Sequence, residues 1–330
     1  MLNLYDVTLR DGNHALRHSL DPNFVSNYCQ LADRSGVYAI EVGHGNGLGA
    51  SSYLVGKAST SDRELLKVAR EKLTKTKLAI HAIPGFATIN RDLKMAIDLG
   101  VDVFRIATHA TEATTSEKHI EFLANNQKEV HGVLMMSHMN TILGLVEQAK
   151  LMQKYGASAI ILMDSSGHFL PSDVKDRVEA IKNELNIAVG FHAHNNLGVA
   201  ITNAFQALNS GAEIIDGASM GLGAGSGNAQ LENLVAVAKR NNINVSDIEV
   251  FFKMSDITER EFFDKLPRIT SSSIQSGLAG VFSGYAPQVK EIAQQYGVDE
   301  SIIWEEMAKR KLVAGQETMI KEIAVDLMNL

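Results

Sequence analysis

A series of short apolar segments, repeated from Leu4 to Ala218, constrains the fold more than any other feature of the chain. The segments are β-branched or continuously apolar, which is typical of parallel strands buried on both faces. They begin roughly 25 to 40 residues apart, the length of one strand–helix unit. We therefore predict eight strands, at Leu4–Leu9, Tyr38–Val42, Leu78–Ile83, Val103–Thr108, Gly132–Met136, Ala159–Met163, Ala188–His192 and Ile214–Ala218.

Helical patterns lie between the predicted strands. Glu64–Ala69 and Leu145–Met152 place apolar side chains with the 3.6-residue period of a helix. A strand followed by a helix, eight times over, predicts an α/β fold, the (β/α)8 TIM barrel. The rival, a doubly wound open sheet, expects a Gly-x-Gly-x-x-Gly turn after its first strand, and Arg10–His14 lacks that pattern.

The pattern changes near residue 255, where helical periodicity replaces the alternation of strands and helices. We therefore predict a catalytic barrel at residues 1–254 and a helical domain with no readable chemistry of its own at residues 255–330. Within the second domain a break is expected at Pro267–Ser273. The expected helices are Glu259–Leu266, Pro287–Tyr296, Asp299–Arg310 and Met319–Met328.

Charge and hydropathy exclude several classes of protein. The net charge is −7 and no run of Lys or Arg occurs, so nucleic-acid binding is not expected. The apolar runs reach about six residues, far short of the ~20 that a membrane-spanning helix needs. The first residues lack the basic and apolar regions of an export signal, so we expect a cytoplasmic protein with no membrane partner.

Metal-ligating residues follow two of the predicted strands. Barrel active sites lie at the carboxyl ends of the strands, where Asp11 follows the first strand, and His192 and His194 end the seventh. Alternate residues of a strand share a face, so His192 and His194 can both point into the barrel mouth. Only the eighth strand separates the first strand from the seventh, so the side chains must span about 10 Å. We predict a divalent-metal site at Asp11, His192 and His194, with Asn228 as a further oxygen ligand. The alternative is a buried histidine pair without a metal.

Further polar residues near strand ends are candidates for a supporting role. Ser165 is predicted to contact a substrate carboxylate. The stretch Gly221–Gly227, after the eighth strand, is either a phosphate cradle or a flexible active-site loop. The other strand-end residues are expected to act through hydrogen bonds to the site: Glu41, His44, Arg105, His109, His138, Asp164 and Asp216.

Two of these motifs resemble a known family. Thr8–Gly12 and His192–Asn195 are similar to the metal-dependent barrel enzymes related to hydroxymethylglutaryl-CoA lyase and isopropylmalate synthase. The resemblance narrows, nearly end to end, to the 4-hydroxy-2-oxovalerate aldolases. The segments that carry this closer match are Gly43–Gly49, Ala107–Ala113, Leu134–Met139, Gly221–Gly225 and Gly315–Glu317.

The resemblance implies a lyase, a class II aldolase that cleaves or forms a 4-hydroxy-2-oxo acid. Pyruvate and an aldehyde are the products of cleavage, through a pyruvate enolate. A divalent cation acts as Lewis acid, with Mn²⁺ expected and Mg²⁺ or Co²⁺ as alternatives. Arg10 is expected to stabilise the enolate charge and His14 to act as general base, with His192 also near the substrate. For Arg10 the alternative is a structural ion pair with Glu41.

A Schiff-base aldolase is the mechanistic rival, and it requires a desolvated lysine inside the barrel. No lysine lies in the body or at the carboxyl end of a predicted strand. This argues for the metal independently of the resemblance.

Three positions depart from the family pattern. Phe282 stands where the relatives carry a tyrosine whose hydroxyl reaches the active site, with Tyr285 as a nearby substitute. Asn13 replaces a methionine before the predicted base. His81 replaces an apolar residue of the aldehyde pocket, so we expect His81 to contact a larger or polar aldehyde, unless it pairs with a neighbouring carboxylate.

The resemblance also implies a partner, an acylating aldehyde dehydrogenase that receives the aldehyde. Ala314–Glu317 resembles the segment of the family that lines the channel to this partner. We expect a homodimer or a hetero-oligomer. Two other functions remain as alternatives: a Claisen-type synthase that joins an acyl-CoA to a 2-oxo acid, and a weakly active scaffold for a dehydrogenase.

Overall fold

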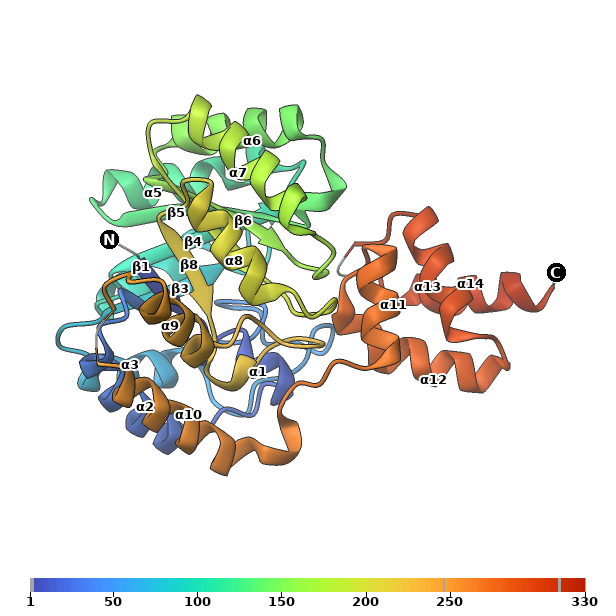
Figure 1. The fold of residues 1–330 in the computed structure, drawn as a ribbon, viewed down its shortest axis with the longest axis horizontal. Helices are drawn as coiled ribbons and strands as arrows, with labels where there is room; N and C mark the ends of the chain where they lie inside the picture. Colours follow the sequence, from blue (N-terminus) through green and yellow to red (C-terminus); the bar gives the residue numbers. More distant parts are fainter. Residues whose placement is uncertain (1–2, 246, 314–315, 330) are drawn as a thin grey trace.

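The computed structural model describes residues 3–245, 247–313 and 316–329. Eight parallel strands close into one barrel, in which each strand pairs with its neighbour in sequence and β8 pairs with β1 (Figure 1). The predicted TIM barrel is therefore confirmed. The strands are β1 (Asn3–Asp6), β2 (Ala39–Glu41), β3 (Lys77–Ala82), β4 (Val103–His109), β5 (Glu129–Met135), β6 (Ala159–Asp164), β7 (Ala188–Ala193) and β8 (Ile214–Gly217).

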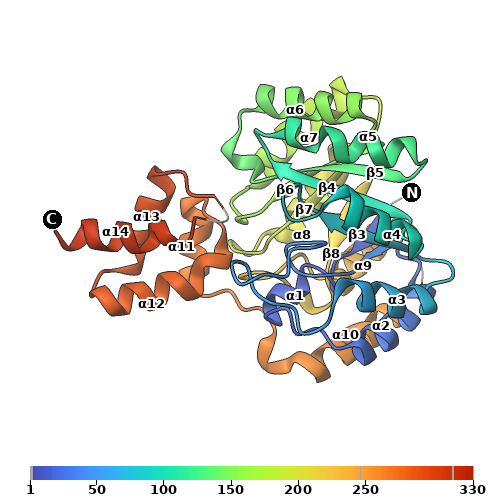
Figure 2. The same cartoon turned by 180° about the vertical axis from the view of Figure 1, so that it is seen from behind.

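Helices surround the barrel on all sides (Figures 1 and 2). The largest apolar core fills the space between these helices and the outer faces of the strands. The helices up to the end of the barrel are α1 (Gly12–Ala15), α2 (Pro22–Ser35), α3 (Asp62–Lys72), α4 (Lys94–Asp98), α5 (Glu117–Asn125), α6 (Ile142–Tyr155), α7 (Pro171–Glu184), α8 (Ala200–Asn209), α9 (Leu231–Arg240) and α10 (Ile248–Phe262). Within the described residues, no helix has both the length and the hydropathy to cross a bilayer.

The first strand is shorter than predicted, because the chain turns at Val7. The carbonyl of Val7 accepts hydrogen bonds from the amides of Arg10 and Asp11, at 3.2 and 2.8 Å. The prediction of a strand up to Leu9 was therefore wrong at its carboxyl end. The tight turn brings Arg10 and Asp11 over the barrel mouth, directly before α1.

A polar cluster closes the amino-terminal end of the barrel interior. Glu129 of β5 accepts hydrogen bonds from Lys77 at 2.6 Å and from Tyr38 at 2.9 Å. His131 donates to the same carboxylate at 3.0 Å, and Tyr5 lies beside them. Burial opposes ionisation of Glu129, but the bonds from His131 and Lys77 outweigh it and lower its pKa to about 2.

We predict that Glu129→Gln destabilises the fold at neutral pH by about 1–2 kcal/mol, the range for a hydrogen bond to a charged group. The pKa is lower in the folded chain than its ordinary value of 4.5, so the stabilisation is complete above pH 4.5 and is lost as pH falls toward 2. Urea unfolding of both proteins across this range checks the prediction. An equal difference at every pH would mean that the charge of Glu129 is not responsible.

The helix α10 runs unbroken through the predicted domain boundary at residue 254. It packs on the barrel, where Phe262 meets Phe24 of α2 edge to face with ring centroids 4.6 Å apart. The carboxyl-terminal lobe begins after it and consists of α11 (Ser271–Ala279), α12 (Ala286–Tyr296), α13 (Glu300–Lys309) and α14 (Thr318–Met328) (Figure 1). We therefore propose that the boundary between the two domains follows α10.

The carboxyl-terminal lobe has an apolar core of its own. Trp304 and Met307 of α13 are buried in it, together with Val289 of α12 and Ile320 of α14. Sequence patterning missed α11, because its serine-rich sequence has weak periodicity. The helix begins with a capping box, in which Thr270 and Ser273 bond each other's backbone amides.

Candidate active site

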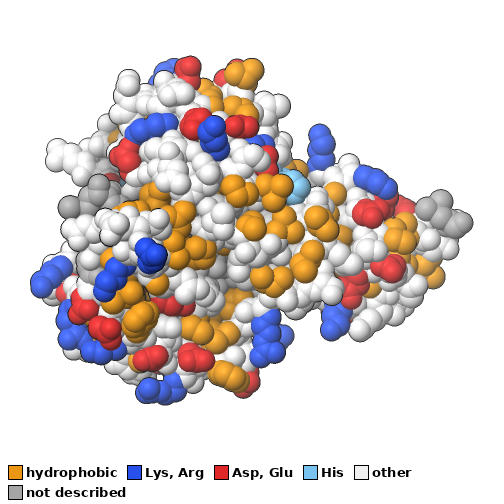
Figure 3. Space-filling view, viewed as in Figure 1, with side chains coloured by type: hydrophobic (Ala, Val, Ile, Leu, Met, Phe, Trp, Pro, Cys, Tyr) orange, Lys and Arg blue, Asp and Glu red, His pale blue; other side chains and the backbone are white. Residues whose placement is uncertain are grey.

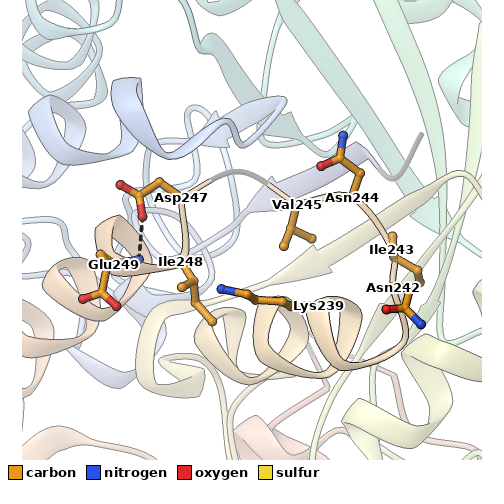
Figure 4. Close-up of a pocket in the computed structure, with 8 residues that line it drawn as sticks. All are labelled: Lys239, Asn242, Ile243, Asn244, Val245, Asp247, Ile248 and Glu249. Atoms are coloured by element: carbon orange, nitrogen blue, oxygen red, sulfur yellow. Dashed lines mark hydrogen bonds between the residues drawn. The ribbon is translucent and has the colours of Figure 1, made fainter.

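A surface hollow of about 520 Å³ lies between the end of α9 and the start of α10 (Figure 4). Helices of the barrel run antiparallel to the strands, so the end of α9 lies at the amino-terminal face, opposite the mouth. Asp247, one of its charged residues, caps α10 by accepting a hydrogen bond from the amide of Glu249 at 3.1 Å. The hollow contains none of the predicted site residues, and the barrel mouth is the candidate site.

Three predicted ligands come together at the mouth. Asp11 lies in the turn after β1, His192 in β7, and His194 just after β7. Each offers one ligand atom, and these atoms all lie within 4.8 Å of one another. All three side chains are buried, and the Nε2 atoms of the two histidines are 3.3 Å apart.

The protonation states of this group suit a divalent cation. Nδ1 of His192 donates to Asp216 at 2.9 Å, which turns its other ring nitrogen, Nε2, toward His194. Burial lowers the pKa of His194 to about 4, so its imidazole is neutral at pH 7. Burial opposes ionisation of Asp11, but Arg10 and His194 hold its pKa below the ordinary value. Neutral imidazoles and an ionised carboxylate are the forms that bind metals.

Asn228 lies against the same group. Its Nδ2 donates to Asp11 at 2.7 Å, and its backbone pairs with His194. Its Oδ1 is buried and has no partner among the described residues, as expected of an oxygen available to a cation. The predicted ligand set therefore lies in one place and fits a divalent ion.

The glycine-rich loop wraps closely around these ligands. A Cβ at Gly223 would lie 2.3 Å from Nδ2 of Asn228 and 2.7 Å from Oδ2 of Asp11. A side chain at this position would displace both groups. Close packing against the predicted ligands thus explains why residue 223 is a glycine. Of the two interpretations of Gly221–Gly227, this favours an active-site loop over a phosphate cradle.

Arg10 forms the structural ion pair with Glu41 that the sequence raised as an alternative, and it also keeps a side-chain nitrogen available for a ligand. Its Nε donates to Glu41 at 2.7 Å and its Nη1 to Asp11 at 2.7 Å. Its Nη2 is buried and has no partner among the described residues. The guanidinium is therefore held by two carboxylates and retains N–H groups for a ligand in the mouth.

A chain of buried ion pairs connects Arg10 to His192 beneath the mouth. Arg105 of β4 donates to Glu41 at 2.9 Å and to Asp216 at 2.8 Å. Glu41 holds Arg10 and Asp216 holds His192, so one guanidinium supports both sides of the site. The sequence analysis named these residues but not their connection. Side chains of a strand alternate between its two faces, so the sequence could have shown that Glu41, Arg105 and Asp216 all point into the barrel. That shared direction is the signal that predicts their connection.

His14 of α1 lies at the edge of the mouth. Its ring meets His18 at 5.3 Å and Phe282, from the carboxyl-terminal lobe, at 6.4 Å between centroids. Burial lowers the pKa of His14 to about 4, with Asp11 acting in the opposite direction. The imidazole is therefore neutral at pH 7 and able to accept a proton.

Two further candidates are buried in the barrel interior. Ser165 accepts a hydrogen bond from the amide of Met136 at 2.9 Å, and its hydroxyl hydrogen has no acceptor among the described residues. His81 of β3 is 3% exposed, and its Nδ1 has no hydrogen bond among the described residues. The closest carboxylate oxygen, Oε1 of Glu41, is 4.0 Å away, too far for the paired alternative to form a hydrogen bond.

Tyr285 and Lys77 make hydrogen bonds away from the mouth. Tyr285 is buried in the carboxyl-terminal lobe, where its hydroxyl donates to the carbonyl of Val313, so it does not replace the hydroxyl missing at Phe282. Asn13 donates to the carbonyl of Gly43 at 2.9 Å. Lys77 begins β3 at the opposite end of the barrel, where it bonds Glu129, so its amine does not serve a Schiff base at the mouth.

Comparisons with known proteins agree with this architecture. Residues 1–261 match the HMGL-like family, and residues 267–329 match the DmpG-like communication domain. A 4-hydroxy-2-oxovalerate aldolase of Pectobacterium atrosepticum is 50% identical over 98% of this chain and 95% of its own. The same enzyme name is carried by a protein of Spirochaeta aurantia that is 50% identical over 98% of this chain and 95% of its own.

Solved structures share the fold at low identity. The amino-terminal domain of a putative aldolase from Bacteroides vulgatus superposes with a TM-score of 0.78 and 23% identity, covering 90% of this chain and 98% of that chain. The carboxyl transferase domain of Rhizobium etli pyruvate carboxylase superposes with a TM-score of 0.83 and 16% identity, covering 99% of this chain and 60% of that one.

Proposed function

The chain belongs to the HMGL-like family and, within it, to the 4-hydroxy-2-oxovalerate aldolases, and we propose that the residues of its barrel mouth cleave or form a 4-hydroxy-2-oxo acid. One observation carries the assignment of these residues. A cation-binding group, an arginine with free N–H groups and a neutral histidine meet in one buried mouth.

Asp11, His192, His194 and Asn228 would hold the cation. When bound, a divalent ion supplies Lewis-acid polarisation of the 2-oxo group. We expect Mn²⁺ to support activity best, with Mg²⁺ or Co²⁺ able to replace it, because a mixed nitrogen and oxygen site discriminates weakly among these ions.

The residues around the ligands divide the remaining work. His14 accepts the proton of the C4 hydroxyl as the C3–C4 bond breaks and the aldehyde forms. The electrons of that bond move toward the C2 oxygen, where Arg10 Nη2 donates a hydrogen bond to the developing charge. The proton held by His14 is then available to C3, which completes pyruvate. Ser165, through its free hydroxyl hydrogen, orients the substrate carboxylate.

A substrate screen tests this function. The protein with Mn²⁺ is mixed with pyruvate and a series of aldehydes, and the 4-hydroxy-2-oxo products are measured. Product with at least one aldehyde is the expected result. Absence of every aldol product, together with release of free thiol from acetyl-CoA and a 2-oxo acid, would establish the Claisen-type synthase instead.

His81 and Phe282 predict the choice of aldehyde. An imidazole with an unbonded Nδ1 can hydrogen-bond a polar substituent, and a site built for such a bond strongly rejects substrates that lack it. We expect a higher kcat/KM for a hydroxylated or aromatic aldehyde than for acetaldehyde. His81→Leu should reverse or abolish the preference for the polar aldehyde, as measured by the ratio of kcat/KM values.

A matched variant, Ile83→Leu, changes a residue just after β3 without changing its polarity, and it should leave the ratio near that of the wild type. If acetaldehyde is the best substrate and His81→Leu leaves the ratio unchanged, His81 does not contact the aldehyde.

The carboxyl-terminal lobe points to a partner. The match of residues 267–329 to a communication domain supports an acylating aldehyde dehydrogenase that receives the aldehyde directly. Of the segment that resembles the channel lining, Ala314 and Gly315 lie outside the described residues. Size-exclusion chromatography of the chain co-expressed with such a dehydrogenase tests the association, and separate elution of the two proteins would contradict it.

A further inference from the structure

Two histidines of the barrel bind the end of α11, the first helix of the carboxyl-terminal lobe. His138 follows β5, and its Nε2 donates to the carbonyl of Gly280 at 2.6 Å. His168 follows β6, and its Nδ1 donates to the carbonyl of Gly277 at 2.7 Å. The amide of Gly280 also donates to the carbonyl of Gly277, at 3.2 Å, so the two imidazoles add side-chain donors to the turn that ends α11.

The contact is supported on both sides. Ser166 is 3.3 Å from the second ring nitrogen of His138, where its hydroxyl can donate, and burial lowers the pKa of His138 to about 4. The neutral imidazole therefore keeps its proton on Nε2, toward Gly280. Asn196, after β7, donates to the carbonyl of Ser273 at 3.1 Å and so binds the same helix from a third loop. Figure 3 shows hydrophobic side chains on both sides of this junction.

The end of α11 leads directly to the active site. Gly280 adopts a left-handed conformation, with φ 68°, and the next amide, that of Val281, bonds the carbonyl of Ser276 at 3.0 Å. This closed turn fixes the direction in which the chain leaves the helix. Phe282 follows, and its ring meets His14 edge to face. The position of Phe282 therefore depends on where the end of α11 is held.

We propose that His138 and His168 are positioning residues that hold the end of α11 at the barrel mouth and so place Phe282 beside His14. The proposal rests on the proposed aldolase function, in which Phe282 helps to set the choice of aldehyde. The cation-binding residues and Arg10, which activate pyruvate in the proposed function, belong to the barrel and not to α11. The two histidines therefore serve the aldehyde step and not the activation of pyruvate.

Alanine and amide variants separate this role from a general loss of structure. His138→Ala and His168→Ala remove the donors, whereas His138→Gln and His168→Asn keep an N–H at a similar place. We expect each alanine variant to lower kcat/KM for aldol addition roughly 10- to 100-fold, the effect of a displaced contact. The amide variants should recover most of this loss. Exchange of the pyruvate methyl protons with D₂O, which needs no aldehyde, should stay within about twofold of the wild type in all four.

His119→Ala is the matched control, because His119 also donates to a backbone carbonyl, that of Ala87, but within the barrel. It should retain both activities. A Phe282→Ala background gives a second control. Adding His168→Ala to it should cause little further loss, because the bond from His168 to Gly277 acts through the Phe282 ring, which this background already lacks.

Hydrogen exchange of the backbone amides of residues 271–285 measures how firmly the end of α11 is held. It does so without an activity assay. Faster exchange in the two alanine variants, with recovery in the amide variants, supports the proposal. Unchanged amide exchange in the alanine variants overturns the proposal. A parallel loss of aldol addition and of pyruvate methyl-proton exchange also overturns it. If amide exchange changes as expected but the wild type forms no aldol product, the aldolase function fails and the positioning of α11 stands.

Discussion

His192→Ala is expected to lose bound metal and aldolase activity together while keeping its fold. Nε2 of His192 lies 3.3 Å from that of His194 and within the group of three ligands, so its removal leaves only one imidazole for the cation. We expect activity to fall by at least roughly 10³-fold, since both the Lewis acid and the orientation of the 2-oxo acid depend on it. Elemental analysis and pyruvate release measure the two losses, and circular dichroism measures the fold.

His131→Ala is the matched control for this variant. His131 is also a buried histidine of the barrel interior, but it lies at the amino-terminal end with Glu129. It should keep its metal even if its stability falls. Full metal occupancy in purified His192→Ala would remove His192 from the proposed ligand set.

His14→Ala is expected to lower turnover by roughly 10²- to 10⁴-fold, the usual range for a positioned general base. The burial that lowers the pKa of His14 to about 4 keeps its ring neutral and ready to accept the C4 proton. Metal content should not change, because His14 is not among the ligands. Steady-state kinetics with elemental analysis of the same preparation checks both statements.

His18→Ala distinguishes the base from its neighbours, because His18 packs on His14 and stacks on His44 with centroids 3.6 Å apart. It should cost far less turnover than His14→Ala. Wild-type turnover in His14→Ala would assign the base to another residue of the mouth.

The sequence predicted most of the architecture because the signals were local and repeated. Each strand of a closed parallel barrel is buried on both sides, so its apolar run stands out against the helices. The order of strands then placed Asp11 and His194 on opposite sides of β8. Their convergence followed from the barrel rule that sites lie at the carboxyl ends of strands.

What the sequence did not predict depends on contacts between distant segments. The turn at Val7 ends β1 early, and nothing in the apolar run signals it. The connection of Arg105 to Glu41 and Asp216 needs the register of three strands. The contact of His138 with Gly280 joins residues 142 positions apart, and no periodicity carries that information.

Pyruvate release from 4-hydroxy-2-oxovalerate, measured before and after removal of the metal, tests the central claim most directly. The protein is treated with a chelator, assayed, and assayed again after Mn²⁺ is added, with His192→Ala in parallel. The account predicts pyruvate release that disappears with the chelator, returns with Mn²⁺ and is absent in the variant. Undiminished release from the metal-free protein, or none after Mn²⁺ is restored, would contradict it.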